Sequence, residues 1–484
     1  MDMPTGDPKQ DELFAPGGVA TIAGKQLCLL DPIAAKRGKI TPLPVDISSP
    51  AHKARATLEA KYRDVLVHRL DFRRLVTYVP NKDIPVYNWF KYKEGFSRQL
   101  VFHLAKEFGL AKGDLILDPF AGCGTTLLAA KELGLPALGF DILPVSVFVA
   151  QVKLMDWPNL DVLLAAVDKL MGVPYRPPQG TLPDVRIINL AFSRAVQSQL
   201  LFYKQEIAKF EPPLRDFLML GLLSILESVS STSKDGQFLR LVQRKIPPVK
   251  DALRSILTLM VSDLSSRQQT LFRSGNAKAE MLEGDARQLP LHRKYEGKIS
   301  AVITSPPYLN RYDYSRTYAL ELCLLSVNSP QDMVRVRHSL LRSHIESREH
   351  TGKQITLPAL DEILDGLAHQ KLNNERMPIM VQGYFEDMNL VISSLGKYVK
   401  PGGRVALVVA NAQFAGESVP TDLMLSELAA DHGFKTEEIW ITRYKGNSSQ
   451  QMAIYGRRPV RESIVFWRKD AWSRPHGADG PLGA

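Results

Sequence analysis

The sequence predicts an α/β protein built around an open, doubly wound, mostly parallel β-sheet. Two observations predict this fold. Short apolar runs, each long enough for one buried strand, alternate with segments of helical periodicity. A glycine-rich turn joins the first of these strands to the helix that follows it. In such sheets ligands bind in the crevice at the carboxyl ends of the strands, so this turn marks the candidate site.

The first half of the sheet is predicted from one continuous stretch. In order, we expect a helix at 100–110, a buried strand at 114–120, a glycine turn and helix at 121–134, and a second strand at 135–142. Gly122 and Gly124 allow the backbone to approach a ligand where a Cβ would collide. Asp141 ends the second strand, where a carboxylate can accept hydrogen bonds from two ribose hydroxyls.

The second half of the sheet is predicted much later in the chain. Asp285 lies at a strand-to-loop junction in 283–290. We expect a strand with a Pro-Pro corner at 298–308, a helix at 384–403, a strand at 404–411, a helix at 423–434, and strands at 435–445 and 462–469. The last two strands are separated by a glycine-bearing loop, which predicts an antiparallel hairpin on the sheet edge.

The remaining segments are predicted to surround this sheet. A helical insertion at 156–280 is expected to read DNA or to act as a structural lid, and a second insert spans about 309–380. The full division is a loosely ordered arm at 1–50, a basic segment plus the first half of the sheet at 51–155, the insertion at 156–280, the second half at 281–470, and a disordered tail at 471–484.

Composition limits the possible functions. The 484 residues carry a net charge of +10, which favours a polyanionic partner such as nucleic acid. The three cysteines, Cys28, Cys123 and Cys323, are too scattered for a disulfide framework or a metal knuckle. The N-terminus lacks a signal-peptide pattern and no apolar run has the length of a membrane helix. We therefore expect an intracellular protein of a prokaryotic cytoplasm, with no membrane partner and no metal.

The glycine turn favours one kind of cofactor. Gly124 is followed by threonines and no lysine, which argues against a phosphate-binding P-loop. Leu127 occupies the position of the third glycine of a dinucleotide fingerprint. A nucleoside without a polyphosphate therefore fits better, and S-adenosylmethionine is the candidate.

The motif DPFAGCGTT followed by TSPPY resembles the amino-methylating DNA methyltransferases, which methylate the exocyclic nitrogen of cytosine or adenine. The resemblance covers roughly 85–145 and 280–470 and implies a Rossmann-like methyltransferase sheet. It places Asp118 near the methionine amino group, Asp141 at the ribose and Asp285 at the adenine amine. The cofactor-binding residues that it implies are Ser97, Asp118, Phe120, Gly122, Gly124, Thr125, Asp141 and Asp285.

The same resemblance makes 305–308 the catalytic corner. An aromatic amine is a poor nucleophile because its lone pair is conjugated into the ring. The Ser305 hydroxyl and the Pro306 carbonyl can each accept one amine hydrogen and so direct the lone pair at the methyl group. Pro306 and Pro307 fix the backbone beforehand, and Tyr308 offers a stacking face to a base turned out of the helix. No covalent intermediate is needed, since position 307 is proline rather than cysteine.

The resemblance also suggests the target and the partners. Serine at 305 favours cytosine N4 over adenine N6, because adenine enzymes of this family more often have Asp or Asn there. The expected partner is double-stranded DNA, with a cognate restriction or defence nuclease as a further candidate. Residues expected to contact DNA are Arg311, Tyr312, Lys234, Arg240, Arg443, Asn447 and Ser448. An RNA methyltransferase and a catalytically silent DNA-binding protein remain alternatives, and the oligomeric state is left open.

Overall fold

The computed structural model describes residues 52–157, 159–234, 239–271, 277–347, 355–445 and 459–470, together with two short paired strands, β1 (Val19–Ile22) and β2 (Lys25–Cys28). Apart from these two strands, the predicted arm at 1–50 lies outside the described residues, as does the predicted tail at 471–484.

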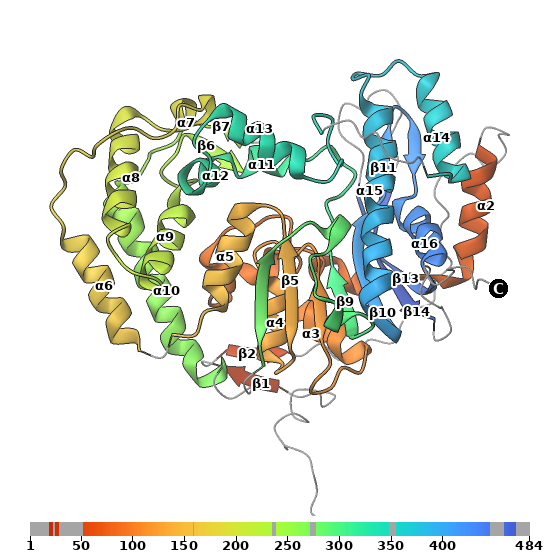
Figure 1. Cartoon of the computed structure of the whole chain (residues 1–484), viewed down its shortest axis with the longest axis horizontal. Helices are drawn as coiled ribbons and strands as arrows, with labels where there is room; N and C mark the ends of the chain where they lie inside the picture. The colour runs from red at the N-terminus through yellow and green to blue at the C-terminus, as the bar shows by residue number, and fades with distance from the viewer. Residues whose placement is uncertain are drawn as a thin grey trace, which may run out of the picture.

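An eight-stranded sheet forms the centre of the molecule (Figure 1). Its order is β3 (Leu66–His68), β13 (Phe434–Lys445), β14 (Val460–Lys469), β10 (Val399–Ala410), β9 (Ile299–Thr304), β4 (Ile116–Asp118), β5 (Ala137–Asp141), β8 (Ala279–Glu283). Every neighbouring pair is parallel except those of β14, which runs antiparallel to both β10 and β13. The predicted doubly wound, mostly parallel sheet is confirmed.

The predicted antiparallel hairpin is present, and the structure refines its place in the sheet. Strands β13 and β14 pair over most of their length. Strand β3 pairs with the outer side of β13, with Leu66 opposite Ile439 and His68 opposite Ile441. The edge of the sheet is therefore β3, a three-residue strand too short to give a periodic signal in the sequence.

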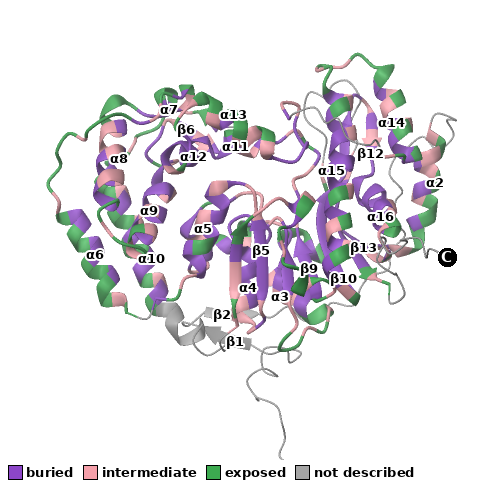
Figure 2. Ribbon diagram, viewed as in Figure 1, coloured by how far each residue is buried: buried purple, intermediate pink, exposed green. Residues whose placement is uncertain are grey.

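Helices cover both faces of the sheet, as the near-continuous apolar strands require. Alternate side chains of β10 separate the two layers: Ala406 and Val408 belong to one core, and Leu407 and Val409 belong to the other. The helices around the sheet are α3 (Arg98–Glu107), α4 (Thr125–Glu132) and α5 (Pro144–Leu154), and α2 (Lys53–Tyr62), α14 (Pro358–Ala368), α15 (Met377–Tyr398) and α16 (Thr421–Asp431). Figure 2 shows that the strands are buried and that the exposed residues lie on the outer helix faces.

The segment between β5 and β8 is helical, as predicted. It consists of α6 (Leu160–Gly172), α7 (Arg186–Ala191), α8 (Arg194–Ile207), α9 (Leu214–Ile225), α10 (Val249–Leu271) and a small hairpin of β6 (Thr232–Lys234) and β7 (Leu239–Leu241). Gly221 of α9 permits close packing on α10, since a Cβ there would lie 2.5 Å from Leu257 Cδ2. This helical insertion packs beside α5 at one side of the sheet (Figure 1).

The second insert is divided between two sides of the molecule. Its first part contains α11 (Tyr314–Thr317), α12 (Ala319–Leu325) and α13 (Pro330–Ser339), which approach the helical insertion (Figure 1). Its later helix, α14, packs on α2 and α15 at the other side, near the short pair β11 (Ala412–Phe414) and β12 (Glu417–Val419). No helix in the described part of the chain is both long and apolar enough to span a membrane.

Candidate active site

A cavity lies at the carboxyl ends of β9, β4, β5 and β8, and it encloses about 870 Å³ including its open mouth. This size suits a small-molecule ligand. Of the residues predicted from the sequence, the cavity is lined by Asp118, Phe120, Gly122, Thr125, Asp141, Asp285, Ser305 and Pro307. The structure thus brings together the glycine turn, both strand-end acids and the Pro-Pro corner, although they are far apart in sequence.

The glycine turn provides the close approach that a ligand needs. Gly122 has a φ of 51°, and a Cβ there would lie 2.9 Å from a ring carbon of Tyr92. Gly124 has a φ of 83° and precedes α4; a Cβ there would lie 2.9 Å from Ala150 Cβ. Gly124 therefore serves the packing of α4 on α5, and it does not line the cavity.

Asp141 ties the turn to the sheet and faces the cavity. Its two carboxylate oxygens accept hydrogen bonds from Gly122 N and Leu143 N, each at 2.9 Å. Burial raises the pKa of Asp141 to about 6, although these backbone bonds act in the opposite direction. A carboxylate at the tip of β5 beside a glycine turn fits the ribose of a nucleoside cofactor.

Asp118 is held by the protein itself. Thr126 and Thr304 each donate a hydroxyl hydrogen bond to it at 2.6 Å, and Phe120 N donates a third at 3.1 Å. Its side chain is almost fully buried, and burial raises its pKa to about 6. Asp118 thus links the end of β4 to the start of α4 and the end of β9.

Ser97 does not reach the cavity. It is fully buried and caps helix α3, accepting a hydrogen bond from Leu100 N at 3.2 Å. The neighbouring segment that precedes α3 does reach the cavity, through Tyr92, Glu94 and Phe96. The prediction of a direct cofactor contact for Ser97 is therefore corrected to a role in positioning this segment.

Ser305 and its neighbours form the corner at the end of β9. The Ser305 hydroxyl donates to the Val408 carbonyl at 3.1 Å, so its oxygen can serve other groups only as an acceptor, and the Tyr308 hydroxyl lies within its reach. Pro307 lines the cavity, whereas Pro306 and Tyr308 lie beside it. The Ser305 oxygen is therefore a hydrogen-bond acceptor at the wall of the cavity that Asp118 and Gly122 also line.

Tyr308 is positioned by a buried acid on β14. Its hydroxyl donates to Glu462 at 3.0 Å, and Glu462 also pairs with Arg443 and, at 2.9 Å, with Lys445. Burial alone would raise the pKa of Glu462, but the two cations lower it overall, so this carboxylate is ionised. The Lys445 ammonium lies 5.4 Å from the centre of the Tyr308 ring. Arg443, predicted to contact DNA, is thus occupied with Glu462.

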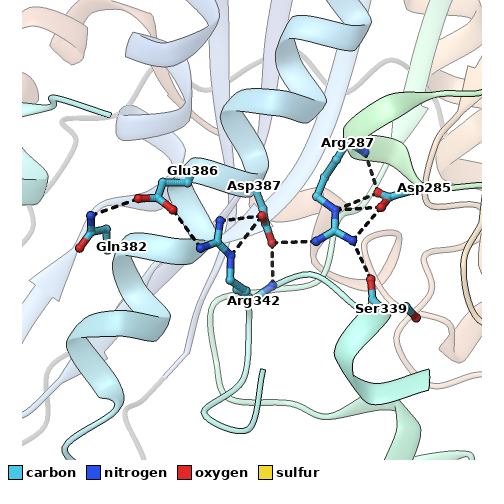
Figure 3. Close-up of polar contacts among 7 residues, drawn as sticks. All are labelled: Asp285, Arg287, Ser339, Arg342, Gln382, Glu386 and Asp387. Atoms are coloured by element: carbon cyan, nitrogen blue, oxygen red, sulfur yellow. Dashed lines mark hydrogen bonds and ion pairs between the residues drawn. The ribbon is translucent and has the colours of Figure 1, made fainter. Parts of the chain in front are cut away.

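Asp285 belongs to an ion-pair network at the β8 end of the cavity (Figure 3). Arg287 donates to both oxygens of Asp285, at 2.7 to 3.0 Å, and also to the Ser339 carbonyl and to Asp387 at 3.3 Å. Arg342 in turn donates to Asp387 at 2.8 Å and to Glu386 at 2.9 Å. The network holds the cavity wall of the second insert against helix α15.

The residues predicted to contact DNA have different surroundings. Lys234 is 2% exposed and its ammonium pairs with Glu321 at 2.5 Å, so it cannot reach DNA phosphates and that prediction is corrected. Tyr312 is also buried, edge-on to Tyr314. Arg311 is half-buried with a φ of 67°, and Arg240 is exposed on β7. Asn447 and Ser448 lie outside the described residues.

Sequence reasoning missed the side chains that hold the site together. These are Glu94, Arg287, Arg342, Asp387 and Glu462. Glu94 lies three positions before the predicted Ser97, and Arg287 lies two positions after the predicted Asp285, so nearness in sequence to a predicted residue was the available signal for both. The described residues contain no group of His, Cys, Asp or Glu arranged to hold a metal ion.

The fold and the cavity define an S-adenosylmethionine-dependent methyltransferase. The strand order, the glycine turn at the end of β4, the acid at the end of β5 and the acceptor-bearing corner at the end of β9 are the parts that such an enzyme needs. The residues present fit the cofactor, since Gly122 and Asp141 both line the cavity at the strand ends.

Comparisons with known proteins give the family. A sequence model of the N6_N4_Mtase family, described as DNA methylase, matches residues 76–151. The chain is 34% identical over 474 residues to the Type II methyltransferase M.BsoBI of Geobacillus stearothermophilus, covering 86% of this chain and 92% of that protein. It is 33% identical over 446 residues to the Type II methyltransferase M.AvaI of Anabaena variabilis, covering 85% of this chain and 92% of that protein. The chain belongs to the amino-methylating DNA methyltransferases, as its sequence predicted.

Solved structures resemble the chain more distantly. A methyltransferase from Methanosarcina mazei, described as SAM-dependent, aligns over 76% of this chain and 97% of its own at 9% identity, with a TM-score of 0.29. The fold assignment therefore rests on the strand order described above.

Proposed function

We propose that the protein transfers the methyl group of S-adenosylmethionine to the N4 amine of a cytosine in double-stranded DNA. The observation that carries the proposal is the placement of Ser305. Its hydroxyl hydrogen is given to the Val408 carbonyl, so its oxygen faces the cavity as an acceptor. An acceptor fixed in this way can bind one hydrogen of an exocyclic amine before any chemistry occurs.

The chemistry follows from that acceptor. The cofactor supplies an electrophilic methyl group on a sulfonium. Ser305 and the Pro306 carbonyl would each accept one amine hydrogen, which favours a tetrahedral nitrogen with its lone pair toward the methyl carbon. When bound, the cofactor would give up its methyl group to the amine nitrogen with the electron pair of the carbon–sulfur bond left on sulfur, and the methylated amine would lose a proton to water. Alignment of the two reactants by the corner and the cavity supplies most of the rate enhancement.

Tyr308 would hold the base. Its hydroxyl is fixed by Glu462, so the ring is prevented from rotating freely when a base enters. A base can reach this position only after rotating out of the duplex, as enzymes that act on bases within a helix require. The ionised Glu462 with its two cations thus positions the stacking surface.

Serine at position 305 favours cytosine over adenine as the target base, because adenine enzymes of the family that the sequence resembles more often have Asp or Asn there. Adenine N6 is the alternative within the same mechanism. The relatives M.BsoBI and M.AvaI are described as Type II methyltransferases, which supports a role in modification and a cognate nuclease as partner.

DNA would approach the cavity at the carboxyl ends of the strands. The helical insertion and the helices α14 and α15 lie at opposite sides of the sheet (Figure 1). Arg240 on the insertion and Arg311 after the corner are the predicted contacts that the structure leaves on or near the surface. The net charge of +10 supports a polyanionic partner, and binding should weaken as salt rises.

The decisive experiment is methyl transfer from labelled cofactor to mixed-sequence duplex DNA and, separately, to total RNA, followed by nucleoside analysis. N4-methylcytosine in DNA is the expected product. N6-methyladenine in DNA would agree with the proposed mechanism but would contradict the assignment of cytosine as the target base. Label in RNA alone would replace DNA by RNA as substrate, whereas salt-dependent DNA binding without transfer to either would indicate a silent DNA-binding protein.

A further inference from the structure

Arg311 is a cation without a partner, three residues after the Pro-Pro corner. In the part of the chain that the structure describes, its side chain forms no hydrogen bond, ion pair or ring contact. The residue is half-buried, but none of its guanidinium nitrogens is enclosed without a partner, so the group is open to solvent. Its charge is therefore available to an anion that comes from outside the protein.

The other arginines in the same stretch of the second insert, 309–347, are all paired with acids. The pairs are Arg316 and Arg337 with Glu346, Arg335 with Asp332, and Arg342 with Asp387 and Glu386. The positive charges of this segment are thus neutralised within the protein, and Arg311 is the exception among its described residues.

The backbone of Arg311 is fixed in a conformation that a residue with a Cβ adopts only at a cost. Its φ is 67°, in the left-handed region. Arg311 N donates to the Ser343 carbonyl at 3.0 Å, and the Asn310 side chain accepts from Tyr312 N at 3.1 Å. Glycine would fit this turn better, so the backbone gives no reason for an arginine here. A function of the side chain does.

Arg311 follows closely on the residue that would hold the target base. Tyr308, whose ring would stack on that base, is three residues away, which is at most about 10 Å of chain. A base that rotates out of a duplex stays joined through its sugar to two backbone phosphates. Guanidinium is the side-chain group that can bind a phosphate through two parallel hydrogen bonds.

We propose that Arg311 binds the DNA backbone phosphate beside the target nucleotide and so holds the rotated base against Tyr308. Because Arg311 N is bonded to Ser343, which lines the cavity, this phosphate site has a fixed position relative to the cofactor. The proposal rests on the function proposed above, in which a base leaves the duplex, but it does not depend on which base is methylated.

The test compares Arg311→Gly with the wild type on plasmid DNA of mixed sequence. Glycine removes the guanidinium and adopts a φ of 67° without strain, so the thermal midpoint of unfolding should not fall. The KM for DNA should rise about 10-fold with kcat within about threefold, because the contact is made before and during transfer. In filter binding, the plot of log affinity against log salt concentration should lose about one unit of slope. Affinity for S-adenosylhomocysteine should not change.

Arg316→Gln is the matched control. It removes the same charge from the same insert, but Arg316 is already paired with Glu346, and Glu346 keeps its second partner Arg337 at 3.0 Å. This variant should retain the salt slope and a KM for DNA within about twofold of the wild type.

A chemical change in the DNA tests the position of the contact. Once the methylated base is mapped, a short duplex can be made with neutral methylphosphonates in place of the phosphates beside that base. The wild type should bind this duplex about 10-fold more weakly than the unmodified one, and Arg311→Gly should bind both equally. Equal losses for the two proteins would assign that phosphate to another residue.

Four other outcomes would overturn the proposal. Unchanged DNA affinity in Arg311→Gly would remove Arg311 from the interface, and weaker binding with an unchanged salt slope would indicate a contact with a base. Equal losses in Arg316→Gln would indicate an effect of net charge, and a loss of cofactor affinity would assign Arg311 to the support of the cavity. The function proposed above is tested by the methylated nucleoside, and filter binding needs no transfer, so the two failures are distinguishable.

Discussion

The two ends of the cofactor cavity contain acids in different electrostatic states. At the β8 end, Asp285 and Asp387 are each bonded to an arginine, and Arg342 joins Asp387 to Glu386. At the end of β4 and in the segment before α3, Asp118 and Glu94 accept hydrogen bonds mainly from hydroxyls, and burial raises the pKa of both. Arginines pair with the acids of the first group, whereas no ion pair in the described part of the chain involves Asp118 or Glu94.

This difference fits separate roles for the two groups of acids. Asp285, held by Arg287, would offer a fixed acceptor to the adenine amine in the function that we propose, whereas Asp118 joins the end of β4 to the start of α4 and the end of β9. Carboxylates paired with arginines hold elements of the fold together. A buried carboxylate without a protein cation lowers the stability of the free protein, and a ligand that neutralises it is bound more favourably.

The largest expected effect, on the free energy of unfolding, comes from removing an arginine of the ion-pair network. Arg342→Ala leaves Asp387 and Glu386 buried without their cation, and such a loss costs about 3–5 kcal/mol of the free energy of unfolding. Urea denaturation checks this value. Arg335→Ala, which removes an exposed pair on α13, is the control and should leave the denaturation midpoint nearly unchanged. Equal midpoints for the two variants would contradict the structural role of the network.

Ser305→Ala tests the corner that lies between the two ends. Loss of the acceptor should reduce kcat by about 100-fold, because the amine hydrogen loses its fixed partner in the transition state. Affinity for S-adenosylhomocysteine should stay the same, since the role that we propose for Ser305 is to bind the substrate amine. Steady-state kinetics and calorimetry on the same preparation separate these effects. A parallel fall in cofactor affinity would mean that the corner supports the cavity rather than the chemistry.

Asp141→Asn affects the middle of the cavity and should not discriminate among charged ligands. Its carboxylate fixes Gly122 and, in the function that we propose, accepts from the ribose, which S-adenosylmethionine, S-adenosylhomocysteine and methylthioadenosine share. Affinity for each should fall about 10-fold, which is the expected value of losing one charged hydrogen-bond acceptor. Calorimetric titration of the three ligands measures these losses. A loss confined to the ligands with an ammonium would place the methionine end at Asp141 instead.

The smallest expected effect is a dependence of affinity on pH. Burial raises the pKa of Asp118 and of Asp141 to about 6 and also raises that of Glu94. Asp118 and Asp141 therefore lose their charge as the pH falls below about 6, and a cationic ligand should bind more weakly there. Between pH 7.5 and 5.5 the affinity for S-adenosylmethionine should fall about fourfold, which is the loss of the ionised form of one group with a pKa of about 6, and the affinity for neutral methylthioadenosine should fall less. Identical pH profiles for the two ligands would contradict this.

Local patterns in the sequence predicted the fold and the centre of the site. Buried strands, helical periodicity, the glycine turn and the Pro-Pro corner depend on neighbouring residues, so their order and their placement at strand ends could be predicted from the chain alone. Strand β3 was missed because three residues carry no periodic signal, and its place at the sheet edge is set by pairing with β13.

The sequence by itself therefore determined the class of enzyme, the cofactor and the residues of the corner. Only the tertiary structure decided which charged groups face the cavity and which neutralise one another. Lys234 and Glu321 are 87 residues apart, Arg287 and Asp387 are 100 apart, and Tyr318 and Glu94 are 224 apart. A lysine in a polar loop has the same local signature whether it ends at a phosphate or inside the protein. Its partner is chosen by packing between distant elements, because the desolvation of a charge is compensated only by the groups that the fold places beside it.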